Sequence, residues 1–343
     1  MTISLSETQI KEAFAAQFFP PPEFDAITAA VEEVYAHVAV RLDESSPWGE
    51  GNRAPCSGVL VTADTRFGKT TVVQQVVNGL SELEAIDGTS IDPNSFYYEC
   101  PSTFTNRLML NGLLMGIHGG ESTKRPLTTD AAYMRVQQEL PVFRPTMAII
   151  DEFQYAIHPA VGAAKMSDSV LGSVGIVRNL LNHAAWPLPV VVVGMPELIP
   201  HLEKEQHRFL GEKLIPVELA PMKLDDPAEE ALLEQALLGY CAAAGIGNAI
   251  VDKHFYQRLI HATNRARGLA FELMQVAVLN AWREGRIVLT EHDFAHRYFV
   301  STRAIDAQNP FIVAQWRETD RSRLMRSEEE AVRTVHAARG IAK

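Results

Sequence analysis

The chain has 343 residues, of which 47% are hydrophobic and 21% are charged, and its formal net charge is −11. A chain of this length can bury a sizeable core and predicts about two domains. No stretch approaches the roughly 18 uninterrupted apolar residues of a membrane helix, and no basic segment followed by an apolar one opens the chain, so neither membrane insertion nor secretion is indicated. The negative charge argues against a surface of uniformly positive potential, although it leaves room for a local basic groove that binds nucleic acid.

The three cysteines, Cys56, Cys100 and Cys241, are an odd number without the spacing of metal ligands. They predict small buried residues in a protein of a reducing compartment, and we expect that compartment to be the cytoplasm. The histidines His158, His183, His201 and His207 also lack metal spacing, so no metal site built on histidine or cysteine is expected.

Two helices are expected in the first part of the chain, at residues 6–18 and 24–41, separated by three prolines. A turn-rich connection then leads to a strand at residues 58–62 and to a helical pattern from residue 72. The segment between them reads Ala63-Asp64-Thr65-Arg66-Phe67-Gly68-Lys69-Thr70-Thr71. It matches the phosphate-binding loop G-x-x-x-x-G-K-[ST], except that Ala63 replaces the first glycine. Alanine is tolerable there if its φ is negative.

A strand that feeds a tight turn and a helix start points backbone N–H groups and a helix dipole at one place, which favours a polyphosphate. Lys69 can reach the β- and γ-phosphates of ATP, and the Thr70 hydroxyl can ligate Mg²⁺. We therefore predict that residues 64–71 bind the nucleotide.

A second motif follows after a loop at residues 88–94, a strand at 96–100, a helix at 106–117 and a flexible stretch at 119–126. An apolar strand at residues 147–150 ends in Asp151 and Glu152. Asp151 would hold the Mg²⁺, and Glu152 would polarise the attacking water. Alone, this pattern could equally be a buried strand followed by a solvated acidic turn. Together with the Lys69 loop it favours a nucleotide site.

The rest of the chain predicts two kinds of domain. A helix at residues 174–185 and an apolar strand at 190–194 continue an alternation that predicts a parallel sheet covered on both faces, with nucleotide at the carboxyl ends of its strands. After Pro221, helices are expected at residues 226–244, 252–263, 269–284 and 291–303, with no strand between them. The predicted divisions are an N-terminal helical segment (1–50), an α/β nucleotide-binding domain (51–221), an all-helical lid domain (222–308) and a tail (309–343).

This plan, an α/β domain followed by a helical lid, is that of AAA+ ATPases, and the motifs resemble the TniB/TnsC group, the ATP-dependent regulators of DNA transposition. The resemblance covers residues 20–312. It is carried by residues 64–70, by Ile149-Ile150-Asp151-Glu152-Phe153-Gln154-Tyr155, by Gly194-Met195-Pro196-Glu197-Leu198 and by Asn309-Pro310-Phe311. The resemblance implies an AAA+ P-loop NTPase fold, ATP and Mg²⁺, and a homo-oligomer, as a ring or helical filament, on double-stranded DNA. It also implies contacts to a DDE transposase and to a target-selection protein.

The resemblance also suggests roles for further residues. Met195 occupies the place of a polar γ-phosphate sensor, so hydrolysis would be slow or would depend on Gln154. Arg265 and Arg267 compete for the second sensor position, and Arg267 is favoured because it adjoins the helix start. Arg208 would act across a subunit boundary on the neighbour's γ-phosphate; the alternatives are a plain surface arginine or Arg178 in that role.

DNA contacts are expected after the second strand, where a solvated loop is the alternative: Thr103, Thr105, Asn106, Arg107, Lys124 and Arg125. The tail, with Trp316 and several arginines, is either a partner-binding segment or a terminal helix over residues 317–339. One hypothesis is therefore a transposition regulator whose ATP hydrolysis drives disassembly from DNA. The other is a nucleotide-gated, protein-binding scaffold or signalling switch with little hydrolysis and no DNA binding, which Ala63 and Met195 favour.

Overall fold

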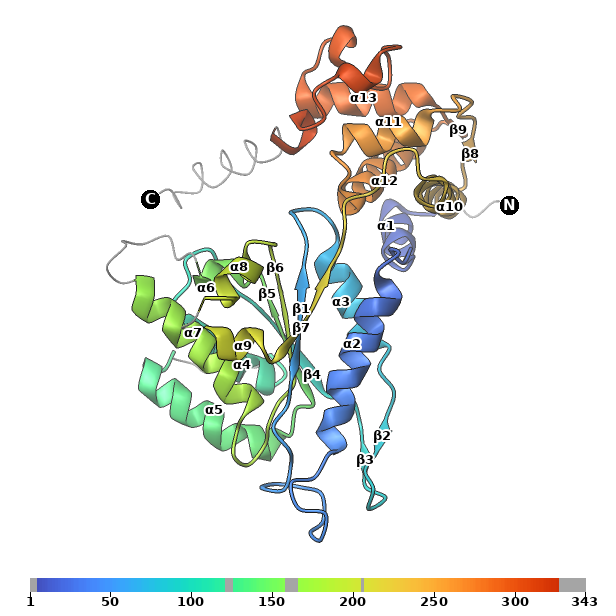
Figure 1. Ribbon diagram of the computed structural model, residues 1–343. Coiled ribbons are helices and arrows are strands. Elements are labelled where there is room, and N and C mark those ends of the chain that lie inside the picture. The colour runs from blue at the N-terminus through green and yellow to red at the C-terminus, as the bar shows by residue number, and fades with distance from the viewer. Residues whose placement is uncertain (1–4, 121–125, 158–165, 205–206, 327–343) are drawn as a thin grey trace. The chain divides into compact units, whose positions relative to one another are not determined.

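The computed structural model describes residues 5–120, 126–157, 166–204 and 207–326 (Figure 1). The chain divides into two compact units. One, here the α/β unit, consists of Pro20–Asp64 and Lys69–Ala220. The other, here the helical unit, consists of Met1–Phe19, Thr65–Gly68 and Pro221–Lys343. The first fifty residues are thus shared between the two units.

A five-stranded parallel sheet forms the centre of the α/β unit, as the alternating pattern predicts. Its strand order is β4-β5-β6-β1-β7, and every neighbouring pair is parallel. The strands are β1 (Gly58–Thr62), β4 (Ser95–Glu99), β5 (Met147–Asp151), β6 (Val190–Gly194) and β7 (Leu214–Glu218). The residues of β1, β5 and β6 are buried throughout, because helices cover both faces of the sheet.

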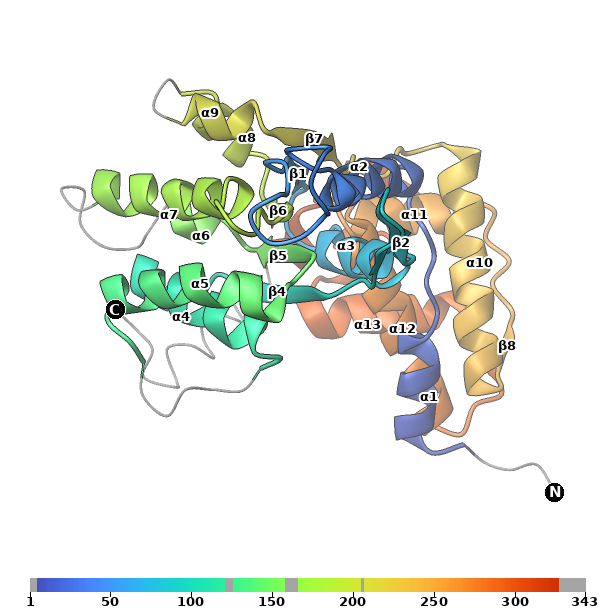
Figure 2. The same cartoon turned by 90° about the horizontal axis from the view of Figure 1, so that it is seen from below.

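Helices lie on both sides of this sheet (Figures 1 and 2). The first side carries α2 (Phe24–Ala36) and α3 (Lys69–Asn78), which pack against β1. The second side carries α4 (Asn106–Ile117), α5 (Thr129–Phe143), α6 (Gln154–Ile157), α7 (Met166–Leu181), α8 (Leu198–Leu202) and α9 (Arg208–Gly211). This is the three-layer arrangement expected for a doubly covered parallel sheet.

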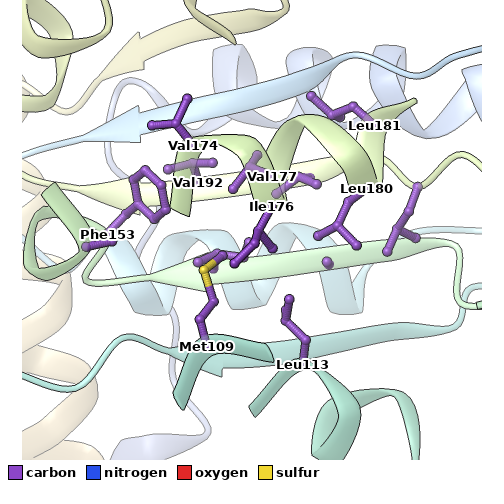
Figure 3. Packing of buried hydrophobic residues seen from close by; sticks show 14 of the residues in the cluster. Met109, Leu113, Phe153, Val174, Ile176, Val177, Leu180, Leu181 and Val192 are labelled. Carbon is purple, nitrogen blue, oxygen red and sulfur yellow. The ribbon is translucent and has the colours of Figure 1, made fainter. Parts of the chain in front are cut away.

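The core on the second side is made by side chains that α4 and α7 direct at the sheet (Figure 3). This buried cluster includes Met109 and Leu113 of α4, Val177 and Leu180 of α7, and Val192 of β6, each of which is at most 1% exposed. Burying an aliphatic side chain of this size contributes about 1.5–3 kcal/mol. The strand ends that carry the polar site residues are thus held by a tightly packed layer.

Several elements of the α/β unit were not predicted, and two of them, β7 and α5, contain a proline at a place that tolerates it. Pro216 lies in β7, which is the edge strand of the sheet, where a missing N–H is tolerated. Pro141 lies in the last turn of α5, which begins after the capping residue Thr128 and ends at Arg144 in a left-handed conformation. The expected loop at residues 88–94 is also partly ordered, since β2 (Leu83–Glu84) pairs antiparallel with β3 (Ser90–Ile91).

The helical unit contains the four helices predicted after residue 221, and α1. They are α10 (Pro227–Ala244), α11 (Phe255–Ala262), α12 (Arg267–Arg283) and α13 (Glu291–Thr302), with α1 (Glu7–Ala15) against α10. The expectation of no strand between them was wrong. The two-residue strands β8 (Gly247–Asn248) and β9 (Val288–Leu289) pair in parallel, because the connections that follow α10 and α12 satisfy each other's backbone groups.

The described part of the tail packs on the helical unit. The buried Asn309 donates to the carbonyl of Ala295 at 2.8 Å, and Arg258 donates to the carbonyl of Pro310 at 2.6 Å. A short 3₁₀ helix, Trp316–Glu318, follows, and its Trp316 is buried beside His261. Most of the helix expected at residues 317–339 lies outside the described residues.

Candidate nucleotide-binding site

The loop predicted to bind phosphate joins β1 to α3, and α3 begins at Lys69. Ala63 is fully buried, and its N–H donates to the carbonyl of Gly194 at 3.1 Å. Its φ is not among the positive values found in the described residues, so the condition for an alanine at this position is met. The positive φ values of the loop are those of Arg66, at 69°, and Gly68, at 87°.

Thr70 and Asp151, the two predicted metal ligands, are brought together by the fold. The Thr70 Oγ1 donates to the Asp151 Oδ2 at 2.5 Å. The other carboxylate oxygen, Oδ1, accepts the N–H of Glu152 at 2.7 Å, and Asp151 is 1% exposed. A hydroxyl and a buried carboxylate are hard oxygen donors, the kind that Mg²⁺ prefers, so these residues fit the predicted metal.

Glu152 lies between two other predicted site residues. Its Oε1 is 3.9 Å from the Nζ of Lys69, and its Oε2 accepts a hydrogen bond from the Nε2 of Gln154. Lys69 and Gln154 are both buried, whereas about a quarter of the Glu152 side chain is exposed, at 28%. Glu152 adopts a left-handed conformation with φ of 54°, which costs about 1–3 kcal/mol in a residue with a side chain. The surrounding contacts therefore hold this carboxylate in a defined place.

Tyr97, on β4, is a residue of the site that sequence reasoning missed. Its hydroxyl donates to the Asp151 Oδ2 at 2.8 Å. In the β4–β5 register Glu99 pairs with Asp151, so Tyr97, two residues earlier, has its side chain on the same face. Burial above all, then the hydrogen bond to Asp151 and that carboxylate's charge, raise the pKa of Tyr97, so the hydroxyl stays protonated and able to donate. The sequence predicts the strand that contains Tyr97. It does not show that this strand lies beside the strand that ends in Asp151.

The tip of the loop, Thr65–Gly68, contacts the start of α12 within the helical unit. Arg66 donates to Glu272 at 2.5 Å, and the N–H of Leu269 donates to the Arg66 carbonyl at 3.2 Å. A Cβ on Gly268 would lie 2.5 Å from that carbonyl oxygen, so only glycine allows this approach. Arg267, the favoured second sensor, is 2% exposed and donates to Glu229 of α10.

Arg208 and Arg178, the candidates for action across a subunit boundary, are both exposed. Arg208 begins α9 and pairs with Glu212 at 2.8 Å, with 72% of its side chain exposed. The guanidinium of Arg178 lies over the Phe209 ring, 4.5 Å from its centre. Either arginine could therefore contact another molecule.

The residues proposed for DNA are in part committed to the fold. Thr105 caps α4 by accepting the N–H of Leu108 at 3.2 Å, and Thr103 is exposed nearby. Arg107 donates to the carbonyls of Pro126 and Leu127, at 3.1 and 2.7 Å. Lys124 and Arg125 lie outside the described residues.

Other classes of site find little support. No group of three or more His, Cys, Asp or Glu in the described parts of the chain could hold a metal ion. The three cysteines are buried and free, as predicted. None of the helices in the described ranges is long and apolar enough to cross a lipid bilayer.

Comparisons with known proteins bear on the domain and on the fold. Residues 53–202 match the family model of the AAA domain. No curated protein sequence matches the chain. Among solved structures, the chain is similar to ORC2 of Aeropyrum pernix, in ADPNP–ADP complexes, with a TM-score of 0.59 and 14% identity over 88% of this chain and 74% of that chain.

Two further structures have a TM-score of 0.57. ORC1 of Aeropyrum pernix, in complex with DNA, is 17% identical over 85% of this chain and 69% of that chain. Cdc6p of Pyrobaculum aerophilum is 13% identical over 84% of this chain and 70% of that chain. At such identities the likeness concerns the fold. Residues 53–202 therefore match an AAA domain, and the fold of the chain is that of an AAA+ P-loop NTPase.

Proposed function

We propose that the chain binds ATP with Mg²⁺ and hydrolyses it. The observation that carries this proposal is the 2.5 Å hydrogen bond between Thr70 and Asp151, beside the 3.9 Å approach of Lys69 to Glu152. The carboxyl ends of β1 and β5 thus bring together three kinds of group. These are two oxygen donors for a cation, a buried lysine that can neutralise phosphate charge, and a partly exposed carboxylate that can bind water. This is where parallel α/β sheets bind their ligands.

Each side chain has a defined task in this proposal. Residues 64–71 bind the phosphates through backbone N–H groups, and Lys69 neutralises their charge. Thr70 and Asp151 hold the Mg²⁺, which supplies electrostatic stabilisation to the transferred phosphoryl group. Glu152 orients and polarises the attacking water. Gln154 orients Glu152 by donating a hydrogen bond to its carboxylate. Hydrolysis depends more on Gln154 because Met195, which follows β6, has no polar side-chain group that could orient the attacking water.

We further propose that the chain regulates DNA transposition. In this proposal ATP drives its assembly on double-stranded target DNA, the assembly recruits and stimulates a DDE transposase with a target-selection protein, and hydrolysis disassembles it. The motifs around Asp151 and at residues 194–198 support it. So does the AAA domain, together with the fact that ORC1, which shares the fold, was solved with DNA. The exposure of Arg208 suits action on a neighbouring subunit's nucleotide.

The test is to mix the purified chain with duplex DNA and either ATP or a slowly hydrolysed analogue, and to examine the mixture by negative-stain electron microscopy. Filaments or rings that need both ligands support the regulator. Assembly that needs nucleotide but is indifferent to DNA would instead support the protein-binding scaffold, for which the thioether of Met195 is the favouring feature. Raising the salt concentration should weaken the DNA-dependent assembly, because phosphate contacts release counterions.

A further inference from the structure

We propose that Tyr97 is a positioning residue that fixes the Asp151 carboxylate for its work on the Mg²⁺. The inference rests on the proposed binding of Mg-ATP and extends it to a residue outside both nucleotide motifs. Tyr97 comes from β4, whereas Asp151 ends β5 and Thr70 lies in the first turn of α3. Three separate elements therefore meet at one carboxylate.

The protein fills most of the acceptor capacity of Asp151. Its Oδ2 accepts both the Thr70 and the Tyr97 hydroxyls, at 2.5 and 2.8 Å, and its Oδ1 accepts the Glu152 N–H at 2.7 Å. A carboxylate has about four lone-pair sites, and three of those of Asp151 accept a hydrogen bond. These three hydrogen bonds fix the orientation of the carboxylate group.

This arrangement has a consequence for Thr70. A hydroxyl has one proton and two acceptor lone pairs, and the Thr70 proton is directed at Asp151. Its lone pairs are then left for the cation. Tyr97 holds the same Oδ2 from the neighbouring strand β4, so removing its hydroxyl loosens Asp151 and, through Asp151, the orientation of Thr70. Groups that orient metal-binding side chains in this way typically contribute about 10–100-fold to metal affinity.

Tyr98 provides a matched control within the same strand. Because side chains alternate along a strand, it faces the other side, where its ring packs against Gly112. Its hydroxyl is buried and has no hydrogen-bond partner among the residues that the structure describes. Tyr98→Phe therefore removes the same chemical group, one residue away, without touching Asp151.

The experiment measures metal binding rather than turnover. Mn²⁺ is titrated into the protein saturated with the analogue AMP-PNP, and free Mn²⁺ is followed by electron paramagnetic resonance. Tyr97→Phe, which keeps the ring, should weaken Mn²⁺ binding at least about tenfold. Its affinity for AMP-PNP in EDTA should stay within about twofold of the wild type, since the metal is absent there. Tyr98→Phe should bind Mn²⁺ like the wild type, and the melting temperatures of both variants show whether the fold is kept.

The possible results separate this inference from the proposed function. If the wild-type protein binds neither AMP-PNP nor Mn²⁺, both the proposed function and this inference are wrong. Normal Mn²⁺ binding by Tyr97→Phe removes only the inference. An equal loss in Tyr97→Phe and Tyr98→Phe also overturns it, because the effect would then arise from general packing of β4.

Discussion

One nitrogen of the Arg267 guanidinium donates to both carboxylate oxygens of Glu229, at 2.8 and 3.0 Å, and both side chains are buried. The pair joins the first residue of α12 to the first turn of α10. A contact between Arg267 and nucleotide stays a prediction, and in this structure Arg267 would have to share its charge between a phosphate and Glu229. The arginine thus has a structural role that is independent of any nucleotide.

Arg267→Met should destabilise the helical unit by about 3–5 kcal/mol, because it leaves the Glu229 charge buried without its partner. The double variant Arg267→Met/Glu229→Leu should recover most of this loss, since an apolar pair has no charge to desolvate. Hydrogen exchange of the α12 amides reports this local stability directly. Equal protection in the wild type and in the single variant would contradict the expectation.

Lys69→Ala should weaken ATP binding at least about 100-fold, equivalent to about 2.7 kcal/mol, because charge-assisted contacts to the phosphates are lost. Isothermal titration calorimetry with Mg-ATP measures the change. Lys253→Ala is the control, since Lys253 is an exposed lysine of the helical unit. Wild-type affinity in the Lys69 variant would remove the phosphate role from this residue.

Glu152→Gln should lower the ATP hydrolysis rate by about 10²–10⁴-fold, because an amide cannot take up a proton from the attacking water. ATP should remain bound, and any nucleotide-dependent assembly should become longer-lived. Single-turnover measurements with labelled ATP separate the chemical step from binding. An unchanged single-turnover rate would show that another group activates the water.

Ala63→Gly should restore the consensus of the loop and yet lower stability by about 0.4–1 kcal/mol. The φ of Ala63 is not positive, so glycine relieves no strain there; it adds entropy to the unfolded chain and removes a buried methyl group. We expect no gain in ATP affinity. Thermal unfolding and calorimetry on the same samples check both parts, and tighter binding of ATP would mean that the alanine methyl group obstructs the loop.

Gly268→Ala should disturb the phosphate loop, because the new Cβ would lie 2.5 Å from the Arg66 carbonyl and 3.2 Å from the Gly68 nitrogen. We expect ATP affinity to fall about tenfold as the loop backbone shifts to relieve the clash. Gly175→Ala in α7 is the matched control. Its Cβ would meet nothing within 4 Å, so it should stabilise the helix by about 1 kcal/mol and leave binding intact. Tight ATP binding by Gly268→Ala would mean that the loop tolerates this shift.

Local patterns in the sequence were enough to predict the two nucleotide motifs and the helices after residue 221. The strand, turn and helix around Lys69 are encoded within one continuous segment, residues 58–78, and an apolar run that ends in Asp151 needs no distant partner to be recognised. Among the elements that were missed, β7 and α5 each contain a proline. Their place, at a sheet edge and in the last turn of a helix, is what makes that proline acceptable.

The sequence by itself therefore determined which chemical groups the site can use, since motif spacing is a short-range property of the chain. Only the tertiary structure decided which residues support those groups. Tyr97 reaches Asp151 because β4 and β5 are neighbours in the sheet, and Arg267 meets Glu229 across 38 positions of the chain. Strand order and helix packing arise from burying apolar faces against one another, and this outcome depends on the whole chain rather than on any local segment.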